Sequence, residues 1–193
     1  MFRFDDILEH WAEIYKPISH SPDPTQKHTA FYRVDMINSD SQFVRNLNLA
    51  PSPALAYSTV LNVEYNDGVL RYGHTMYFLV KQRSQGIAKT SIQEDIEAAE
   101  CKYVMNEYIL DLLVYLRTLK KAALSSKIKD IETANGLRGL DFSRVSWGSV
   151  PVKYNGWWVC VLGLDQIVKA KNCLLEERYK EGSIASLTTS SSL

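Results

Sequence analysis

The sequence predicts an α+β fold: a mostly antiparallel sheet from two β-hairpins plus a strand packs against one long helix, and an N-terminal helix precedes the sheet. Two dipeptides support the hairpins, because Asp67-Gly68 and Asn155-Gly156 each separate two apolar segments. Between the hairpins lies a stretch whose apolar residues have helical spacing and whose two ends carry opposite charges.

The first hairpin is predicted over residues 55–66 and 69–81. Asp-Gly favours a two-residue type I′ turn, because both central residues of that turn need positive φ. In this register Tyr65 lies opposite Leu70, and Glu64 lies opposite Arg71 as a cross-strand pair of opposite charges. The other pairs of one face are almost wholly apolar: Val63 with Tyr72, Leu61 with His74, Thr59 with Met76, Tyr57 with Phe78, and Leu55 with Val80.

The second hairpin is predicted over residues 142–154 and 157–168, around Asn155-Gly156. Both of its faces are apolar. One face pairs Tyr154, Val152 and Val150 with Trp157, Val159 and Val161; the other pairs Pro151, Ser149 and Trp147 with Cys160, Leu162 and Leu164. The pattern leaves open whether the two hairpins join one sheet or two.

The long helix is predicted from Ser91 to about Leu124, with a capping box at Ser91-Ile-Gln-Glu94. Acidic residues lie near its N-terminus and basic residues near its C-terminus, as the helix dipole favours. Its first half carries a narrow apolar stripe, whereas its second half is apolar on most sides. Since a helix on one sheet needs only one apolar stripe, we expect the second half to contact a partner or another segment as well. The stripe of the first half consists of Ile92, Ile96, Ala99 and Tyr103.

Before the first hairpin, residues 4–15 have the spacing of an amphipathic helix, which Asp5 can cap. A strand is predicted over residues 31–37, and a long irregular connection over residues 38–54.

Residues 125–140 are predicted to form a polar connection with a short helical turn that ends at Asn135-Gly136. A further short helix is predicted over residues 171–180. We expect residues 1–181 to form a single domain and the Ser/Thr-rich residues 182–193 to form a disordered tail.

The charge balance argues against two classes of function. The chain carries 22 Lys and Arg residues and 22 Asp and Glu residues, so it lacks the basic excess of a duplex nucleic-acid binder or a membrane-surface protein. No apolar window approaches the ~18 residues of a membrane span, and the N-terminus has no signal-peptide pattern. Three widely spaced cysteines suggest a reducing compartment, and we expect the cytoplasm of a cell or of an infected host.

No motif for catalysis, metal binding or nucleotide binding is present, so we predict no catalytic residue, cofactor, metal or small-molecule ligand. His74 lies on the apolar face of the first hairpin. A hydrogen-bonded core histidine is the expected interpretation, and a catalytic histidine is the minor alternative. His20 and His28 are expected to be solvated, as is a line of carboxylates on the long helix formed by Glu100, Glu107 and Asp111.

Trp157 and Trp158 are adjacent in a strand and therefore point to opposite faces. Unless both faces are covered, one of them is available to a protein partner. The alternative is that the N-terminal helix covers the second face. The candidate interface residues are Trp147, Trp157, Trp158, Tyr108 and Tyr115.

The order helix, strand, hairpin, long helix, hairpin, over residues 4–168, resembles the layout of bacteriophage tail-terminator and tail-completion (neck) proteins. Those proteins assemble as rings at the tail end. The resemblance implies a non-enzymatic structural protein that acts through protein partners as a homo-oligomer. It lies in the layout alone, so no functional residue is carried over. Two alternatives remain: an intracellular binding or regulatory module, and an enzyme whose site assembles between the sheet and residues 38–54.

Overall fold

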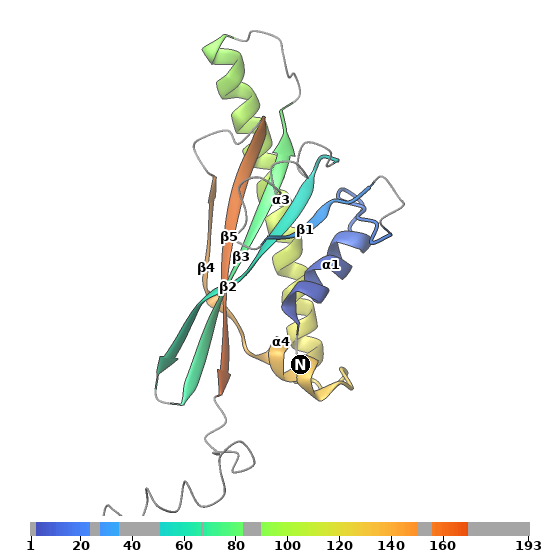
Figure 1. Ribbon diagram of the computed structural model, residues 1–193, viewed down its shortest axis with the longest axis vertical. Coiled ribbons are helices and arrows are strands. Elements are labelled where there is room, and N and C mark those ends of the chain that lie inside the picture. The colour runs from blue at the N-terminus through green and yellow to red at the C-terminus, as the bar shows by residue number, and fades with distance from the viewer. Residues whose placement is uncertain are drawn as a thin grey trace, which may run out of the picture.

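The computed structural model describes residues 3–23, 28–34, 51–66, 68–82, 90–149 and 156–169 (Figure 1). It confirms the α+β class. The predictions for residues 35–37, for most of the connection before Ala54, for residues 171–180 and for the tail at residues 182–193 lie outside the described residues. In chain order the elements are α1 (Phe4–Ile14), β1 (Phe31–Val34), β2 (Ala54–Asn66), β3 (Val69–Lys81), α3 (Ser91–Leu124), α4 (Ile131–Arg138), β4 (Leu140–Ser149) and β5 (Trp157–Lys169).

The two hairpins belong to one five-stranded sheet with the order β1-β2-β3-β5-β4. β1 pairs with β2 in parallel, and all other pairs are antiparallel. The two hairpins are joined by β3 and β5, which pair from Val69 opposite Lys169 to Lys81 opposite Trp157. This long central pair makes the sheet a single body.

The register of the first hairpin is as predicted near its turn, where Tyr65 lies opposite Leu70 and Glu64 opposite Arg71. Gly68 supplies a positive φ of 78° in this turn. Farther along, the predicted register is wrong by two residues, because Tyr57 lies opposite Met76 rather than Phe78. β2 takes four residue steps between Ser58 and Asn62, where β3 takes two. An insertion of two residues preserves the alternation of faces, so Tyr57 stays on the core side.

The register of the second hairpin also differs from the prediction by two residues. Trp147 lies opposite Leu162 and Ser149 opposite Cys160, rather than opposite Leu164 and Leu162. A second irregularity follows between Ser146 and Asp141, where β4 takes five steps and β5 takes two. Three extra residues are an odd number, so the alternation inverts. Leu140 and Trp147 therefore face the same side of the sheet.

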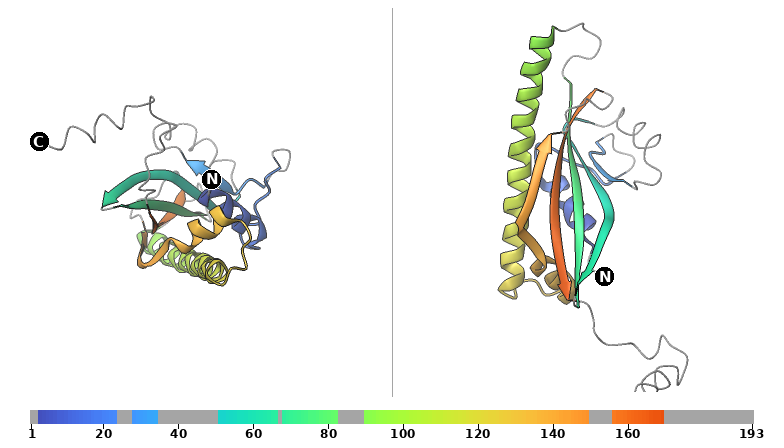
Figure 2. Two further views of the ribbon diagram at one scale, coloured as in Figure 1. Left: turned by 90° about the horizontal axis from the view of Figure 1, so that it is seen from below. Right: turned by 90° about the vertical axis from the view of Figure 1, so that its left-hand side faces the viewer.

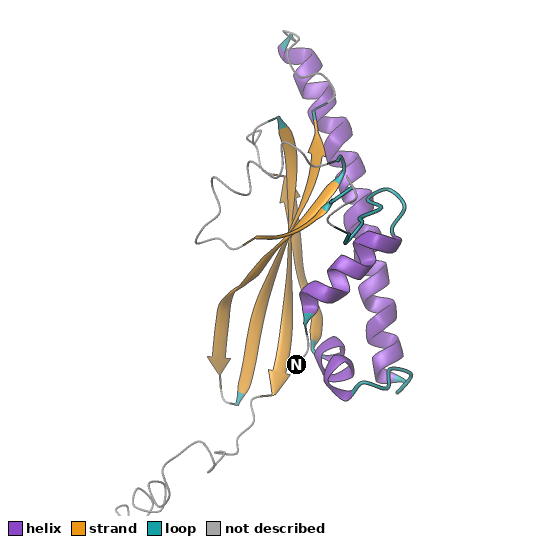
Figure 3. Cartoon of the chain, turned by 45° about the vertical axis from the view of Figure 1, so that its right-hand side comes forward, coloured by secondary structure: helices purple, strands orange, loops and turns teal. Residues whose placement is uncertain are grey.

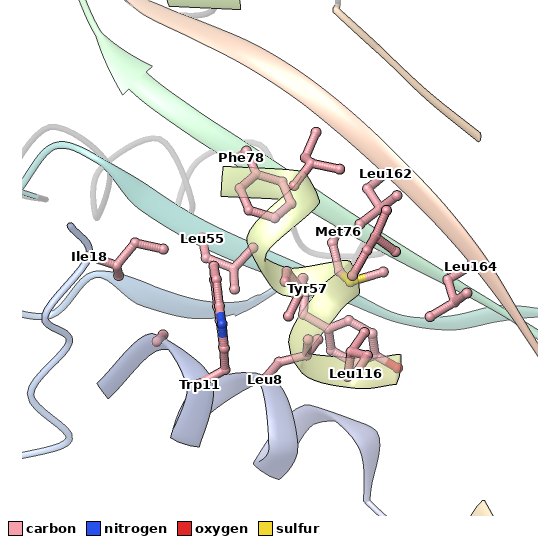
Figure 4. Packing of buried hydrophobic residues seen from close by; sticks show 14 of the residues in the cluster. Leu8, Trp11, Ile18, Leu55, Tyr57, Met76, Phe78, Leu116, Leu162 and Leu164 are labelled. Carbon is pink, nitrogen blue, oxygen red and sulfur yellow. The ribbon is translucent and has the colours of Figure 1, made fainter. Parts of the chain in front are cut away.

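The described helices lie on one side of the sheet (Figures 2 and 3). Figure 4 shows Leu8 and Trp11 of α1 directed toward Leu55, Tyr57 and Phe78 of the sheet, in the core that also receives the buried side of α3. The alternative in which the N-terminal helix covers the second face of the sheet is therefore wrong.

α3 has the predicted length, and its capping box lies one residue earlier than predicted. The Thr90 hydroxyl accepts from the Gln93 N–H at 3.3 Å, and the Gln93 side chain accepts from the Thr90 N–H at 3.1 Å. Thr90 and Ser91 both precede a Gln or Glu at the required spacing, so the local pattern alone does not choose between them.

α1 is not capped by Asp5, which lies inside the helix and bonds to two arginines instead. Its carboxylate lies 2.8 Å from Arg3 and 2.6 Å from Arg33 of β1. Arg33 also contacts Asp6 at 3.0 Å and Glu9 at 2.7 Å. One guanidinium therefore ties β1 to three carboxylates of α1.

α4 begins at a side-chain cap, where Asp130 accepts from the Thr133 N–H at 2.8 Å. The predicted end at Asn135-Gly136 is wrong, because the helix continues to Arg138. Gly139 then brings the backbone against β5: its carbonyl accepts from the Ile167 N–H at 2.8 Å. A Cβ atom at Gly139 would lie 2.3 Å from the Ile167 carbonyl oxygen.

We predict that Gly139→Ala lowers the free energy of unfolding by about 1–3 kcal/mol, because the new methyl group meets backbone that cannot rotate away. The matched control is Gly148→Ala, where a Cβ has no atom within 4 Å, and which should leave stability unchanged or raise it by about 0.5 kcal/mol. Urea unfolding followed by Trp fluorescence measures both. Equal stabilities of the two variants would contradict the close approach of α4 and β5.

Candidate functional site

α3 is apolar on two opposite sides. One side faces the sheet and is buried; its residues are Glu97, Cys101, Met105, Ile109, Leu112, Leu113, Leu116 and Ala123. On the other side five large apolar side chains are exposed: Ile92 (69%), Ile96 (56%), Tyr103 (67%), Leu110 (51%) and Val114 (62%). With Ala99, which is also exposed, these residues form the outward stripe. At 3.6 residues per turn, all of them lie within about 40° of Tyr103 around the helix axis.

The outward stripe includes the four residues whose spacing was predicted in the first half of the helix. These residues, Ile92, Ile96, Ala99 and Tyr103, point away from the sheet. The densely apolar second half of the helix sets the rotation of the whole rod, because a straight helix cannot turn one half independently. In the first half, Cys101 and Met105 consequently face the core. Figure 2 shows α3 along one side of the molecule, with the sheet beside it.

Charged residues border the outward stripe. Glu100 and Glu107 are exposed along one edge, as predicted. Asp111 continues this edge and accepts a hydrogen bond of 2.6 Å from the hydroxyl of Tyr15, the residue after α1. The opposite edge carries exposed Lys102 and Asn106. The stripe is therefore an apolar band with polar borders, which is the usual composition of a protein interface.

The tryptophan pair does not provide the surface considered above. Trp158 is 7% exposed and belongs to the main core. Trp157 is fully buried in a small cluster on the other face of the sheet, where the Lys81 ammonium lies 5.2 Å from its ring centroid. Both faces are covered at this position, so neither ring is available to a partner.

The other three candidate residues differ in exposure. Tyr108 and Tyr115 are half-buried and pack against the core, and Tyr108 meets Tyr15 edge-on at 5.8 Å between ring centroids. Trp147 of the edge strand β4 is 44% exposed. Among the five candidates, only Trp147 presents a large accessible surface. The more extensive exposed band lies on α3, where the spacing of Ile92, Ile96, Ala99 and Tyr103 was predicted.

His74 is the centre of a buried polar network. The Tyr57 hydroxyl lies 2.9 Å from Nδ1, and Gln166 Oε1 lies 3.1 Å from Nε2. Since the Gln166 amide nitrogen donates to the Gly136 carbonyl at 2.9 Å, its oxygen is left to accept from His74 Nε2–H. Nδ1 then accepts from Tyr57. Burial lowers the pKa of His74 to about 4, because the charged ring would lose its hydration.

His20 corrects a second expectation, since it is buried and not solvated. Its Nδ1 accepts from the Ala30 N–H at 3.1 Å, and Nε2 lies 3.7 Å from a Glu9 carboxylate oxygen. Burial lowers the pKa of His20 despite this carboxylate. His28 is exposed, as expected.

Within the described residues, no three His, Cys, Asp or Glu side chains are grouped as metal ligands. No helix in that part of the chain combines the length and apolar character of a membrane span. Cys101 and Cys160 are buried in the core, whereas Cys173 lies outside the described residues. Comparisons with protein-family models, curated proteins and solved structures found no match to this chain.

We predict that His74 makes stability depend on pH. Its folded pKa of about 4 lies below the ordinary value of 6.5, so the unfolded chain binds more protons between these values. The contribution of neutral His74 is complete above pH 6.5 and falls as the pH drops toward 4. One pKa unit corresponds to about 1.4 kcal/mol, so the total loss is roughly 3 kcal/mol.

Urea unfolding of the wild type and of His74→Gln at several pH values isolates this effect from that of His20. The variant should be less stable at neutral pH and should show a shallower decline on acidification. Parallel pH curves for the two proteins would contradict the assignment of the depressed pKa to His74.

The exposure of the outward stripe also predicts that α3 tolerates a charged substitution on its exposed side but not on its buried side. Tyr103→Glu should change the unfolding free energy of the monomer by at most about 0.5 kcal/mol, because the side chain is already in water. Leu112→Glu, on the buried side, should cost more than about 3 kcal/mol, because it places a carboxylate in the core. Circular dichroism melts at submicromolar concentration compare them; similar losses would mean that the rotation of α3 is wrong.

Proposed function

We propose that this chain is a non-enzymatic assembly protein that acts through protein–protein contacts, and that the outward stripe of α3 is its main contact surface. The observation that carries the proposal is the exposure of five large apolar side chains in line on one helix. The core is complete without them, since α3 buries its other side. Their retention on the surface therefore points to a partner.

The size of the stripe fits this role. From Ile92 to Val114 the helix rises about 33 Å, and a band about 10 Å wide covers roughly 300 Å². Apolar patches of about 300–600 Å² are the largest on typical monomers and are often functional. The stripe also combines aliphatic side chains with a central aromatic residue, Tyr103, of a type enriched at interfaces.

The element order supports a more specific form of the proposal, a phage or prophage tail-terminator or neck-like protein that forms homo-oligomers. In that role the chain would work in the cytoplasm of a bacterial host or in the virion. Its partners would be proteins, with no nucleic acid, membrane or small molecule required. The support is the succession of N-terminal helix, sheet strands, long helix and C-terminal strand pair.

The enzyme alternative predicts a polar pocket that brings His74 together with a carboxylate. His74 instead bonds to the uncharged groups of Tyr57 and Gln166. The residues 38–50 that would line such a pocket lie outside the described part of the chain. The observed network therefore gives the enzyme alternative no support.

Photo-crosslinking tests the proposed function. A photoreactive phenylalanine analogue replaces Tyr103 of the outward stripe or, as the matched control, Ile131 of α4, which is 74% exposed. The full chain is expressed in the cells that produce it, irradiated, and its adducts are identified by mass spectrometry. We expect adducts at position 103 in clear excess over position 131, joined to virion structural proteins or to the chain itself.

Two results would contradict the proposal. Equal yields at positions 103 and 131 would remove the stripe as a contact surface. Adducts at position 103 with regulatory proteins, and with no structural protein, would favour the intracellular binding module.

A further inference from the structure

We infer that the outward stripe binds the outward stripe of a second copy of this chain, with the two α3 helices antiparallel and a two-fold axis at Tyr103. This inference rests on the proposed function and names its occupant. The stripe is then a self-complementary surface, because the same residues of both copies form the interface.

The five large apolar residues of the stripe are spaced symmetrically about Tyr103, whereas Ala99 has Glu107 at its mirror position. Ile92 and Val114 each lie eleven residues from it, and Ile96 and Leu110 each lie seven residues from it. In an antiparallel pair with a two-fold axis at Tyr103, residues equidistant from that axis face each other. Each Ile92 then meets Val114 of the second copy, each Ile96 meets Leu110, and the two Tyr103 rings meet at the axis.

Charge along the helix favours antiparallel over parallel pairing. Asp95 and Glu100 lie near the N-terminal end of the stripe, whereas Arg117 and Lys121 lie at its C-terminal end on the exposed side. In the antiparallel pair Arg117 lies about 9 Å along the axis from Asp95 of the second copy, within reach of two extended side chains. In a parallel pair these two residues would lie about 33 Å apart along the axis.

Two features keep this association weak. The buried band of roughly 300 Å² per copy is well below the ~800 Å² per partner of a standard interface. Glu100 and Glu107 also lie on the same edge of the stripe, and the antiparallel pair brings Glu100 of one copy near Glu107 of the other. A dissociation constant of about 10–500 micromolar is therefore expected.

The proximity of Glu100 of one copy to Glu107 of the other provides a test that distinguishes antiparallel from parallel pairing. In the antiparallel pair, Glu107→Lys replaces two repulsive contacts by two attractive ones, so self-association should tighten about 5- to 20-fold. In a parallel pair, the edge that carries Glu107 would instead face Lys102 of the second copy, about 8 Å away along the axis, and the same substitution would weaken association. Sedimentation velocity of the full chain, from about 5 to about 500 micromolar, measures the dissociation constants of the wild type and of Glu107→Lys.

Two further variants act as matched controls. Glu64→Lys makes the same change of charge on β2, on the side of the sheet away from α3, and should leave the dissociation constant unchanged. Leu110→Glu places a carboxylate against Ile96 of the second copy and should abolish association.

Disulfide trapping tests the same geometry independently, in a Cys173→Ser background. Ile96→Cys chains mixed with Leu110→Cys chains should form a mixed disulfide under mild oxidation, while each variant alone should cross-link far less. Self-linking of each variant alone would demonstrate a parallel pair and overturn the inference.

Failure of this inference is distinguishable from failure of the proposed function. If wild type and Glu107→Lys both remain monomeric at about 500 micromolar, the second copy is excluded as the occupant. Photo-adducts of position 103 with a different structural protein would then leave the proposed function intact.

Discussion

The packing of α3 against the sheet fixes the rotation of a 34-residue rod, and the character of the protein's surface depends on that rotation. Met105, Ile109 and Leu112 are fully buried on one side of the helix. The residues on the opposite side of the helix therefore face away from the sheet along the length of α3. A shorter helix, or one broken in the middle, could have turned its first half to bury Ile92 and Ile96 as well. Continuity of the helix is what leaves an apolar band in water.

The sheet supplies a long surface for most of this rod, because β3 and β5 pair along their whole lengths. Within the core, the chain from Tyr57 through His74 and Gln166 to the Gly136 carbonyl connects three strands with α4. A buried polar chain of this kind stabilises one arrangement only when every member is bonded. It therefore helps to define how α4 docks, a task that apolar contacts alone perform with less geometric precision.

Local signals predicted the elements well. The Asx-Gly dipeptides located both hairpins, and the charge asymmetry with a nearby cap located α3, because these features act within a few residues along the chain. Registers far from the turns were wrong, since both hairpins contain irregularities that periodicity does not encode. The side of α3 that faces the sheet could not be read from its first half, where two apolar lines compete. The burial of His20 depends on its contact with Ala30, ten residues away along the chain, and local periodicity does not encode such a contact.

The two strand irregularities differ in parity, and this difference constrains how the sequence can change. The segment between Asp141 and Ser146 holds three extra residues relative to β5, which is why Trp147 and Leu140 share a side. Removing one residue there would force one end of β4 to exchange its inner and outer side chains, whereas removing two would keep their orientation. Length variation at this edge of the sheet should therefore occur in steps of two, and a single-codon deletion should be tolerated less well than the loss of a codon pair.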